Sequence, residues 1–229
     1  MAVLDRGLAP IHAPTMRGWG IFVVLLLAGC IPGGGKDSTP PKFGTERATE
    51  PDKATLQCHA DLDRENVKFR PLPDRYFGDG CTALGSVQLL DIGTPVNNLG
   101  AMTCPLARQF ARWAREAVQP AAQAWLDSRV VRIESFGTYS CRPLNGQAGA
   151  RLSEHGRANA VDIGAFVLAN GKKITILQGW NGEDEDVRRF LRAVHQAGCR
   201  RFQVVLGPDA NAFHRDHLHF DLGNGPYCR

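Results

Sequence analysis

The sequence of 229 residues lacks the marks of several protein classes. It has no excess of one charge, since 27 lysines and arginines stand against 23 aspartates and glutamates, for a formal net charge of +4. We therefore expect no nucleic-acid partner. No Cys-x-x-Cys pair is present, which argues against a cysteine zinc knuckle and a thioredoxin-like motif. No apolar run is long enough to span a bilayer as a helix.

The N-terminus carries a targeting pattern. A single positive charge follows Met16, then an apolar run over 21–27, then "LAGC", which ends at Cys30. This order is typical of a secretory signal. The "LAGC" ending resembles a bacterial lipobox, which implies a signal peptide over 1–29 and lipidation of Cys30. Met16 is then a candidate start. The alternative is a generic signal cleaved near Ala28.

The segment after the signal is predicted to be a tether. Residues 30–55 are rich in proline, glycine, threonine and charge, a composition that cannot bury enough apolar surface to order itself. As a flexible coil this linker would reach about 25–30 Å root-mean-square. By resemblance to enterobacterial sorting rules, Ile31 after the cysteine implies the periplasmic face of the outer membrane. Residues 56–229 are expected to form one domain, as a monomer.

The cysteines predict disulfides. Seven are present, and setting Cys30 aside leaves an even number, which in an exported chain suggests three bonds. Sequence does not select among the possible pairings. The working hypothesis joins them in chain order: Cys58 with Cys81, Cys104 with Cys141, and Cys199 with Cys228.

The hydrophobic pattern predicts an α+β domain with a mostly antiparallel sheet and flanking helices. Residues 56–101 are expected to be loop-rich, with one strand at "SVQLL". Helical spacing of apolar residues predicts one helix that begins near Pro105 and another over "EDEDVRRFLRAVHQAG". Strands are expected at "VVRIESFGTYSC", "FQVVLG" and "HLHFDL", and a hairpin at "NAVDIGAFVLANGKKITIL" turns at its "NG".

Three of the seven histidines lie within six residues, in "HRDHLH". If "HLHFDL" is a strand, its alternation places His217, His219 and Asp221 on one face and apolar residues on the other. His214 can approach the same face from the preceding loop. Two imidazoles and a carboxylate would then converge on one spot.

A second cluster lies upstream, in "SEHGRANAVDIGAF". It contains His155 and, seven residues later, Asp162, which is flanked by valine and isoleucine. A carboxylate buried there without a partner would be costly, and a metal is one partner that removes the cost. Three N and O ligands with an open position are the pattern of a catalytic zinc site. A solvated histidine-rich strand is the alternative. A non-haem iron site is a rival, although its usual first pair is His-x-Asp/Glu and six residues separate His155 from Asp162.

Longer motifs carry a resemblance to known families. "SEHGRANAVD" resembles the S-x-H-x-x-G-x-A-x-D signature of the LAS superfamily of zinc peptidases, with Ala158 in place of its glycine, and "HLH" resembles the second motif. That superfamily includes D-alanyl-D-alanine carboxypeptidases and murein endopeptidases. "CPLARQFARW", "GTYSCR" and "VLGPDANAFHRDHLHFDL" resemble the bacterial extensin-like C-terminal domain family, over roughly Cys58 to Cys228. The resemblance implies an LAS-type core that holds Zn²⁺.

The resemblance implies roles for individual residues. His155, Asp162 and His219 would bind zinc. No His-Glu-x-x-His motif supplies a glutamate base, so His217 is the expected base, because a histidine can exchange protons near neutral pH. His214 would assist it.

Three further residues are expected near this site. Arg142, in "YSCR", resembles a Tyr-Arg element that would stabilise developing negative charge; a surface arginine beside a disulfide is the alternative. Asp221 would orient an imidazole, or it would be a solvated strand residue. Ser153 matches the signature and is expected to be a structural hydrogen-bonder.

Two classes of function follow. The first is a zinc-dependent peptidase that cuts D-amino-acid-containing peptide bonds in peptidoglycan stems or crosslinks, tethered to the membrane by its lipid. The second is a non-catalytic zinc-containing module that binds the cell wall or has a structural role. His217 discriminates between them, because a binding module needs the three ligands but not the base.

Overall fold

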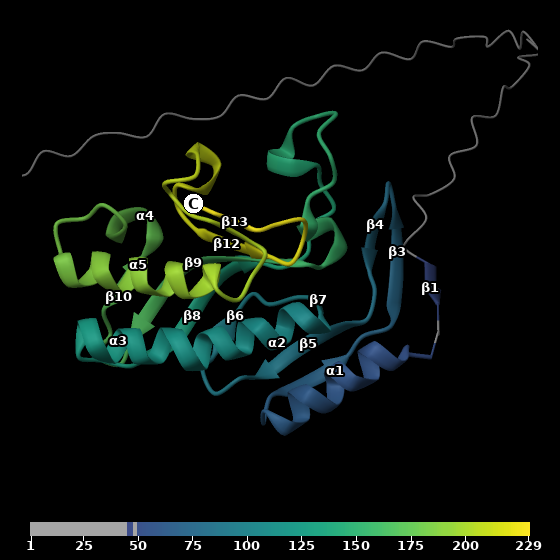
Figure 1. Cartoon of the computed structure of the whole chain (residues 1–229), viewed down its shortest axis with the longest axis horizontal. Helices are drawn as coiled ribbons and strands as arrows, with labels where there is room; N and C mark the ends of the chain where they lie inside the picture. The colour runs from purple at the N-terminus through teal and green to yellow at the C-terminus, as the bar shows by residue number, and fades with distance from the viewer. Residues whose placement is uncertain (1–44, 48–49) are drawn as a thin grey trace, which may run out of the picture. The chain divides into compact units, whose positions relative to one another are not determined.

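The computed structural model describes residues 45–47 and 50–229, which belong to the second of two compact units of the chain, 40–229 (Figure 1). The predicted signal peptide and the lipidation site Cys30 lie outside the described residues. Within the described ranges, no helix is both long and apolar enough to cross a membrane. Strand β1 (Thr45–Arg47) and the start of helix α1 (Lys53–Arg64) lie within the segment predicted as a linker.

A seven-stranded sheet forms the centre of the fold, in the order β13-β11-β12-β9-β8-β6, with β10 also paired to β9. Neighbouring strands are antiparallel except for the pairs β6–β8 and β11–β13. The strands are β6 (Val96–Asn97), β8 (Val130–Gly137), β9 (Ala160–Leu168), β10 (Lys173–Thr175), β11 (Val204–Leu206), β12 (Leu218–Asp221) and β13 (Tyr227–Cys228). With its helices, this sheet confirms the predicted α+β class.

Two small sheets precede the central one, in the orders β1-β3-β4 and β2-β5-β7. Their remaining strands are β2 (Lys68–Pro71), β3 (Asp74–Gly78), β4 (Cys81–Ala83), β5 (Ser86–Asp91) and β7 (Met102–Thr103). The strand predicted at "SVQLL" is confirmed as β5. The prediction of a loop-rich segment over 56–101 is wrong, because helix α1 and several strands occupy it. The sequence did not reveal β2 and β3, since these strands are mostly exposed and show no hydrophobic alternation.

The helices are α2 (Cys104–Trp113), which continues through the π-helical turn η1 (Ala114–Val118) into α3 (Gln119–Leu126), then α4 (Ile176–Gly179) and α5 (Glu185–Cys199). Short 3₁₀ turns are η2 (Leu144–Gly146), η3 (Glu154–Arg157) and η4 (Ala212–His214). Pro105 lies in the first turn of α2, as predicted. The carboxylate of Asp184 accepts hydrogen bonds from two backbone N–H groups and caps α5.

Aromatic side chains join the helices to one face of the central sheet. The ring of Trp113 on α2 lies 6.2 Å from Phe166 on β9 and 4.9 Å from Phe220 on β12, between centroids. Its indole N–H donates to the carbonyl of Val194 on α5 at 2.9 Å. Burying each such ring stabilises the fold by roughly 1.5–3 kcal/mol. Because Leu218 and Phe220 face this core, the side chains between and after them face away.

A β-bulge at Gly164 changes the alternation of β9. The register of β8 against β9 shifts there, and Gly164 has no partner on β8. Phe136 packs over it so closely that a Cβ would lie 2.4 Å from its ring. The bulge lets Ile163 and Phe166, three residues apart, both join the core, while Asp162 points away from it.

The disulfides join Cys58 to Cys104, Cys81 to Cys141, and Cys199 to Cys228. Only the last pair of the chain-order hypothesis is confirmed; Cys58–Cys81 and Cys104–Cys141 are wrong. Helix α1 packs on α2, and this packing brings Cys58 next to Cys104, the first residue of α2. Three disulfides indicate an oxidising, extracytoplasmic compartment.

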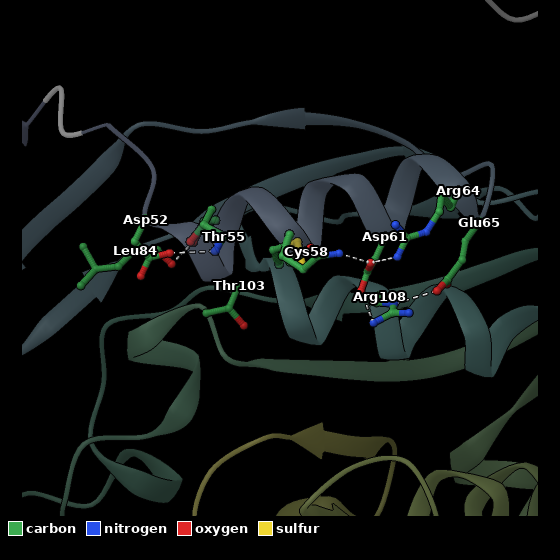
Figure 2. The surroundings of a disulfide bond; sticks show 12 residues. Asp52, Thr55, Cys58, Asp61, Arg64, Glu65, Leu84, Thr103 and Arg108 are labelled. Atoms are coloured by element: carbon green, nitrogen blue, oxygen red, sulfur yellow. Dashed lines mark hydrogen bonds and ion pairs between the residues drawn. A yellow bond between two sulfur atoms is a disulfide. The ribbon is translucent and has the colours of Figure 1, made fainter.

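Ion pairs lie beside the Cys58–Cys104 bond, on the side of the C-terminal end of α1 (Figure 2). Arg108 on α2 contacts Asp61 at 2.5 Å and donates to Glu65 at 2.7 Å, both at the end of α1. Arg64 pairs with the same Asp61 from within α1. Such partly exposed pairs contribute little to stability, whereas the disulfide joins the two helices covalently.

Candidate metal centre

Sheet register brings His219 and Asp162 together. In the antiparallel pair of β12 and β9 the two residues are direct partners. Side chains of such partners lie on the same face of a sheet, with Cβ atoms about 4.5–5.5 Å apart. His219 Nδ1 lies 2.8 Å from Asp162 Oδ1, on the face opposite the helices.

His155 reaches the same point from η3, the turn just before β9. Ser153 accepts a hydrogen bond from the backbone N–H of His155 at 3.3 Å and caps this turn. The turn ends at Ala158 with a φ of 55°, a left-handed conformation that suits glycine best. The backbone therefore has the conformation that a glycine in the zinc-peptidase signature would favour, although the residue here is alanine.

The donor atoms of these residues have the spacing of a zinc site. His155 Nε2 lies 3.2 Å from His219 Nδ1 and 3.1 Å from Asp162 Oδ2. Tetrahedral zinc with bonds of about 2.0 Å separates neighbouring ligands by about 3.3 Å. All three residues are buried, and their ligand atoms could hold one metal ion. Two imidazole nitrogens and a carboxylate oxygen are ligands that zinc accepts.

Hydrogen bonds to the outer ring nitrogens fix both imidazoles. His155 Nδ1 lies 3.0 Å from the carbonyl oxygen of Thr138 and donates to it. His219 Nε2 lies 2.9 Å from Asp221 Oδ2, and the other oxygen of Asp221 accepts from the backbone N–H of Gly223 at 2.7 Å. Donation from the outer nitrogen leaves the inner nitrogen of each ring free to ligate, which is the usual arrangement around metal-bound histidines.

The charges of the cluster also favour a bound cation. Burial would lower the pKa of His219, but hydrogen bonds with Asp162 and Asp221 raise it to about 9. Burial would raise the pKa of Asp162, but hydrogen bonds from His155 and His219 hold it well below its usual range. Without a metal, one imidazolium lies between two buried carboxylates. A divalent cation would balance both carboxylates, so the residues fit zinc.

A second group of donor atoms does not fit a metal in the oxidised protein. His195, Cys199 and Cys228 lie close together, but the two cysteines form a disulfide. A disulfide sulfur is not the thiolate that zinc requires.

His217 lies beside the cluster, just before β12 rather than within it as expected. Its Nε2 is 3.7 Å from Asp162 Oδ1, and its Nδ1 is 2.9 Å from Asp216 Oδ1. The ring of Phe136 packs against it at 5.8 Å between centroids. The side chain of His217 is 14% exposed and lines a cavity.

The imidazole of His214 lies next to that of His217, with 5.1 Å between the ring centroids. Its Nδ1 is 2.8 Å from Asn211 Oδ1. Burial lowers the pKa of His214 to about 4, and the charges of His219 and His217 add to the effect. His214 is therefore neutral at pH 7, with its one N–H at Nδ1 donated to Asn211 and its Nε2 left as an acceptor.

The cluster opens onto a cavity of about 460 Å³, which we call the metal cavity. Its lining includes all three ligand candidates, His214, His217, Asp221, Ser153, Arg142, Arg151, Leu144, Asn145, Asn211, Phe213, Asn224, Tyr227, Val204 and Leu206. Arg142 is half-buried and adjoins the Cys81–Cys141 disulfide. In the described part of the chain, no carboxylate forms an ion pair with Arg142, so its charge is available to a ligand in the cavity.

Several positioning groups were not identified from the sequence. Asp216 faces His217, Asn211 faces His214, and the carbonyl of Thr138 holds His155. Asp216 adjoins His217 in the chain, but neighbours in a strand would point apart. Only the start of β12 at Leu218 shows that these two residues lie in a loop and can meet.

Replacement of Asp221 by asparagine should weaken zinc binding by about 10–100-fold. The amide cannot accept the His219 Nε2–H bond as a carboxylate does, so the ring loses both orientation and basicity. Zinc affinity can be measured by competition with a chromogenic chelator. Asp186→Asn, at the exposed start of α5, is the matched control. Equal affinity in Asp221→Asn and the parent would contradict this role.

The metal-free protein should lose stability as the pH rises from 7 to 9. The folded-state pKa of His219, about 9, lies above the unfolded value, so its contribution is complete below about pH 6.5 and is lost through pH 9. The lowered pKa of His214, about 4 in the folded state, acts in the opposite direction, and its effect is nearly complete by pH 7. We expect a loss on the order of 1–3 kcal/mol, measured by urea unfolding with a chelator. His219→Gln should flatten this alkaline decline, and a decline that persists would assign it to another group.

A family model described as extensin-like protein C-terminus matches residues 56–229. No curated protein and no solved structure shows a significant match to the chain.

Proposed function

Since the chain belongs to the extensin-like C-terminal family, and since its domain buries a His–Asp–His cluster, we propose that it is a zinc-dependent peptidase of the LAS type. The proposed substrates are D-amino-acid-containing peptide bonds in peptidoglycan stems or crosslinks. The observation that carries the proposal is the position of His217. It lies 3.7 Å from the ligand Asp162 without completing the ligand set, and it faces the metal cavity. A purely structural zinc site is closed by four protein ligands, whereas a catalytic site keeps a position open.

The roles of the residues follow from this arrangement. His155, Asp162 and His219 would hold zinc, which when bound supplies Lewis-acid chemistry: it polarises a carbonyl and makes a water acidic enough to attack at neutral pH. His217 accepts the proton from the attacking water and returns it to the leaving amine. Asp216, 2.9 Å from Nδ1, holds the ring so that Nε2 faces the reaction and stabilises the imidazolium that forms.

Two further groups support the same reaction. The guanidinium of Arg142 stabilises the negative charge that develops on the carbonyl oxygen as the water adds. The neutral His214 donates from Nδ1 to Asn211 Oδ1 at 2.8 Å, which leaves its Nε2 as a hydrogen-bond acceptor within the cavity. Because His214 is buried and Arg142 is half-buried, their interactions are stronger than they would be in water.

The deciding experiment uses purified full-length protein and isolated muropeptides. Zinc-loaded protein should convert muropeptides to shorter products that chromatography separates, and a chelator should stop the conversion until zinc is restored. Full zinc occupancy without any product would contradict the peptidase and leave a non-catalytic wall-binding module.

The proposed location is the periplasmic face of the outer membrane, through a lipid on Cys30. The Cys30→Ala variant should then appear in the soluble fraction of the envelope if its signal is still processed, because one lipidated residue supplies the attachment. Fractionation of membranes followed by immunoblotting measures this. A processed variant that remains wholly in the membrane fraction would place the anchor elsewhere.

A further inference from the structure

Two aromatic side chains are exposed in the lining of the metal cavity. Phe213, on η4, is 52% exposed, and Tyr227, on β13, is 50% exposed. At this exposure neither ring is needed to fill the core, so both rings are available to a molecule bound in the cavity. Neither ring is in the aromatic core that joins the helices to the sheet.

Both rings are held on ordered backbone. Asn211 Oδ1 accepts from the backbone N–H of Phe213 at 3.0 Å and caps η4. The backbone N–H of Tyr227 donates to the carbonyl of Gln203 at 2.9 Å, and β13 pairs in parallel with β11. In that pair Tyr227 is the partner of Val204, which also lines the cavity. The disulfide from Cys228 to α5 fixes this strand covalently.

Three polar residues belong to the same cavity lining. The side-chain amides of Asn145 and Asn224 line the metal cavity, as does the guanidinium of Arg151. Across the described ranges, these three side chains form no hydrogen bond or ion pair with another side chain. Planar amide and guanidinium groups can donate to hydroxyl and carbonyl oxygens of a ligand, so the wall offers aromatic faces and free donors together.

We propose that this wall is a glycan subsite, formed by Phe213 and Tyr227, that binds an N-acetylated hexosamine unit of the substrate. A pyranose ring presents C–H groups on its face, which pack on an aromatic ring, and hydroxyl groups at its rim, which need polar partners. Val204 beside Tyr227 offers an apolar contact for the acetamido methyl group. The inference rests on the proposed function, and it specifies that the peptide is bound while still attached to its sugar.

A peptide alone fits this wall less well. An extended peptide would be recognised by an exposed sheet edge or by pockets for its side chains. β13, the edge strand nearest the cavity, is only two residues long. The combination of ring faces with free amides favours a sugar.

The test measures glycan binding directly, without hydrolysis. A β-1,4-linked N-acetylglucosamine tetramer is titrated into zinc-loaded full-length protein by calorimetry. The parent should bind it, and Phe213→Ala and Tyr227→Ala should each raise the Kd by about 2–12-fold, the range of one aromatic contact. Trp125→Ala is the matched control, because Trp125 is an exposed aromatic residue that lines a separate groove between α3 and α5 and should leave the Kd unchanged.

The outcomes separate this inference from the proposed function. A parent protein that does not bind the tetramer, or two cavity variants that bind it as tightly as the parent, would overturn the glycan subsite even if muropeptides are cut. Glycan binding that depends on both rings would support it even if no bond is cut. Circular dichroism and zinc content of each variant show that a weaker Kd does not reflect misfolding.

Discussion

Replacement of His155, Asp162 or His219 by alanine should leave the purified protein with almost no zinc, whereas the parent should hold about one ion per chain. Each change removes one of three ligands, and the loss should exceed the 10–100-fold effect of an outer hydrogen-bond partner. Elemental analysis after gel filtration measures the metal content. His195→Ala is the control, since His195 belongs to the other histidine-containing cluster and bonds to the carbonyl of Arg229 at 3.1 Å. Full zinc in any of the three ligand variants would refute this ligand set.

The three ligand variants should differ in metal-free stability. His219 lies between Asp162 and Asp221, at 2.8 and 2.9 Å, so His219→Ala leaves two buried carboxylates without their shared imidazolium. Removing one member of a buried charged network costs about 3–5 kcal/mol. His155→Ala removes a side chain whose outer nitrogen bonds only to a backbone carbonyl, so it should cost less. Unfolding in the presence of a chelator gives this ranking independently of zinc.

The ligand set could be proposed from sequence because the motifs around His155, Asp162 and His219 resemble those of zinc peptidases, while strand periodicity predicted which side chains share a face. In β12, alternation separates His219 and Asp221 from Leu218 and Phe220, and the structure keeps that division. The expected class of fold is confirmed for the same reason, since β9, β12 and α5 are long or strongly patterned. Membership of the extensin-like family rests on motifs spread over most of the chain.

Other features depend on contacts that no local pattern encodes. The pairing of Cys58 with Cys104 follows from the packing of α1 on α2, which sequence spacing does not report. The bulge at Gly164 inserts one unpaired residue in β9. The two-residue alternation of a strand does not show at which residue the inward and outward faces exchange. Asp216 becomes a partner of His217 only because β12 begins one residue later than the alternation suggested.

The loss of His217 should separate metal binding from catalysis. His217→Ala is expected to keep zinc and the fold while losing about 10²–10⁴-fold in the rate of muropeptide hydrolysis, the usual contribution of a general acid–base group. The side chain does not complete the ligand set: its nearest contact to the cluster is 3.7 Å, to a carboxylate oxygen. Initial rates with saturating zinc, alongside elemental analysis, measure both properties in one preparation.

Variants of the neighbouring residues test how His217 acts. Asp216→Asn keeps the shape of the side chain but removes the charge that stabilises an imidazolium 2.9 Å away, so its rate should lie between those of the parent and His217→Ala. His214→Ala should have a smaller effect than His217→Ala, because burial holds the pKa of His214 near 4 and the residue carries no proton to give at pH 7.

The His217→Gln variant distinguishes a proton carrier from a merely structural histidine. If His217 only filled space, His217→Gln would restore the rate, since the amide is close to imidazole in size and can still hydrogen-bond to Asp216. If His217 moves the proton, glutamine should be as slow as alanine, because an amide cannot accept and return a proton near neutral pH. A His217→Gln variant that cuts muropeptides at the parent rate would therefore remove the base from the mechanism, while zinc retention in the same variant would leave the metal centre intact.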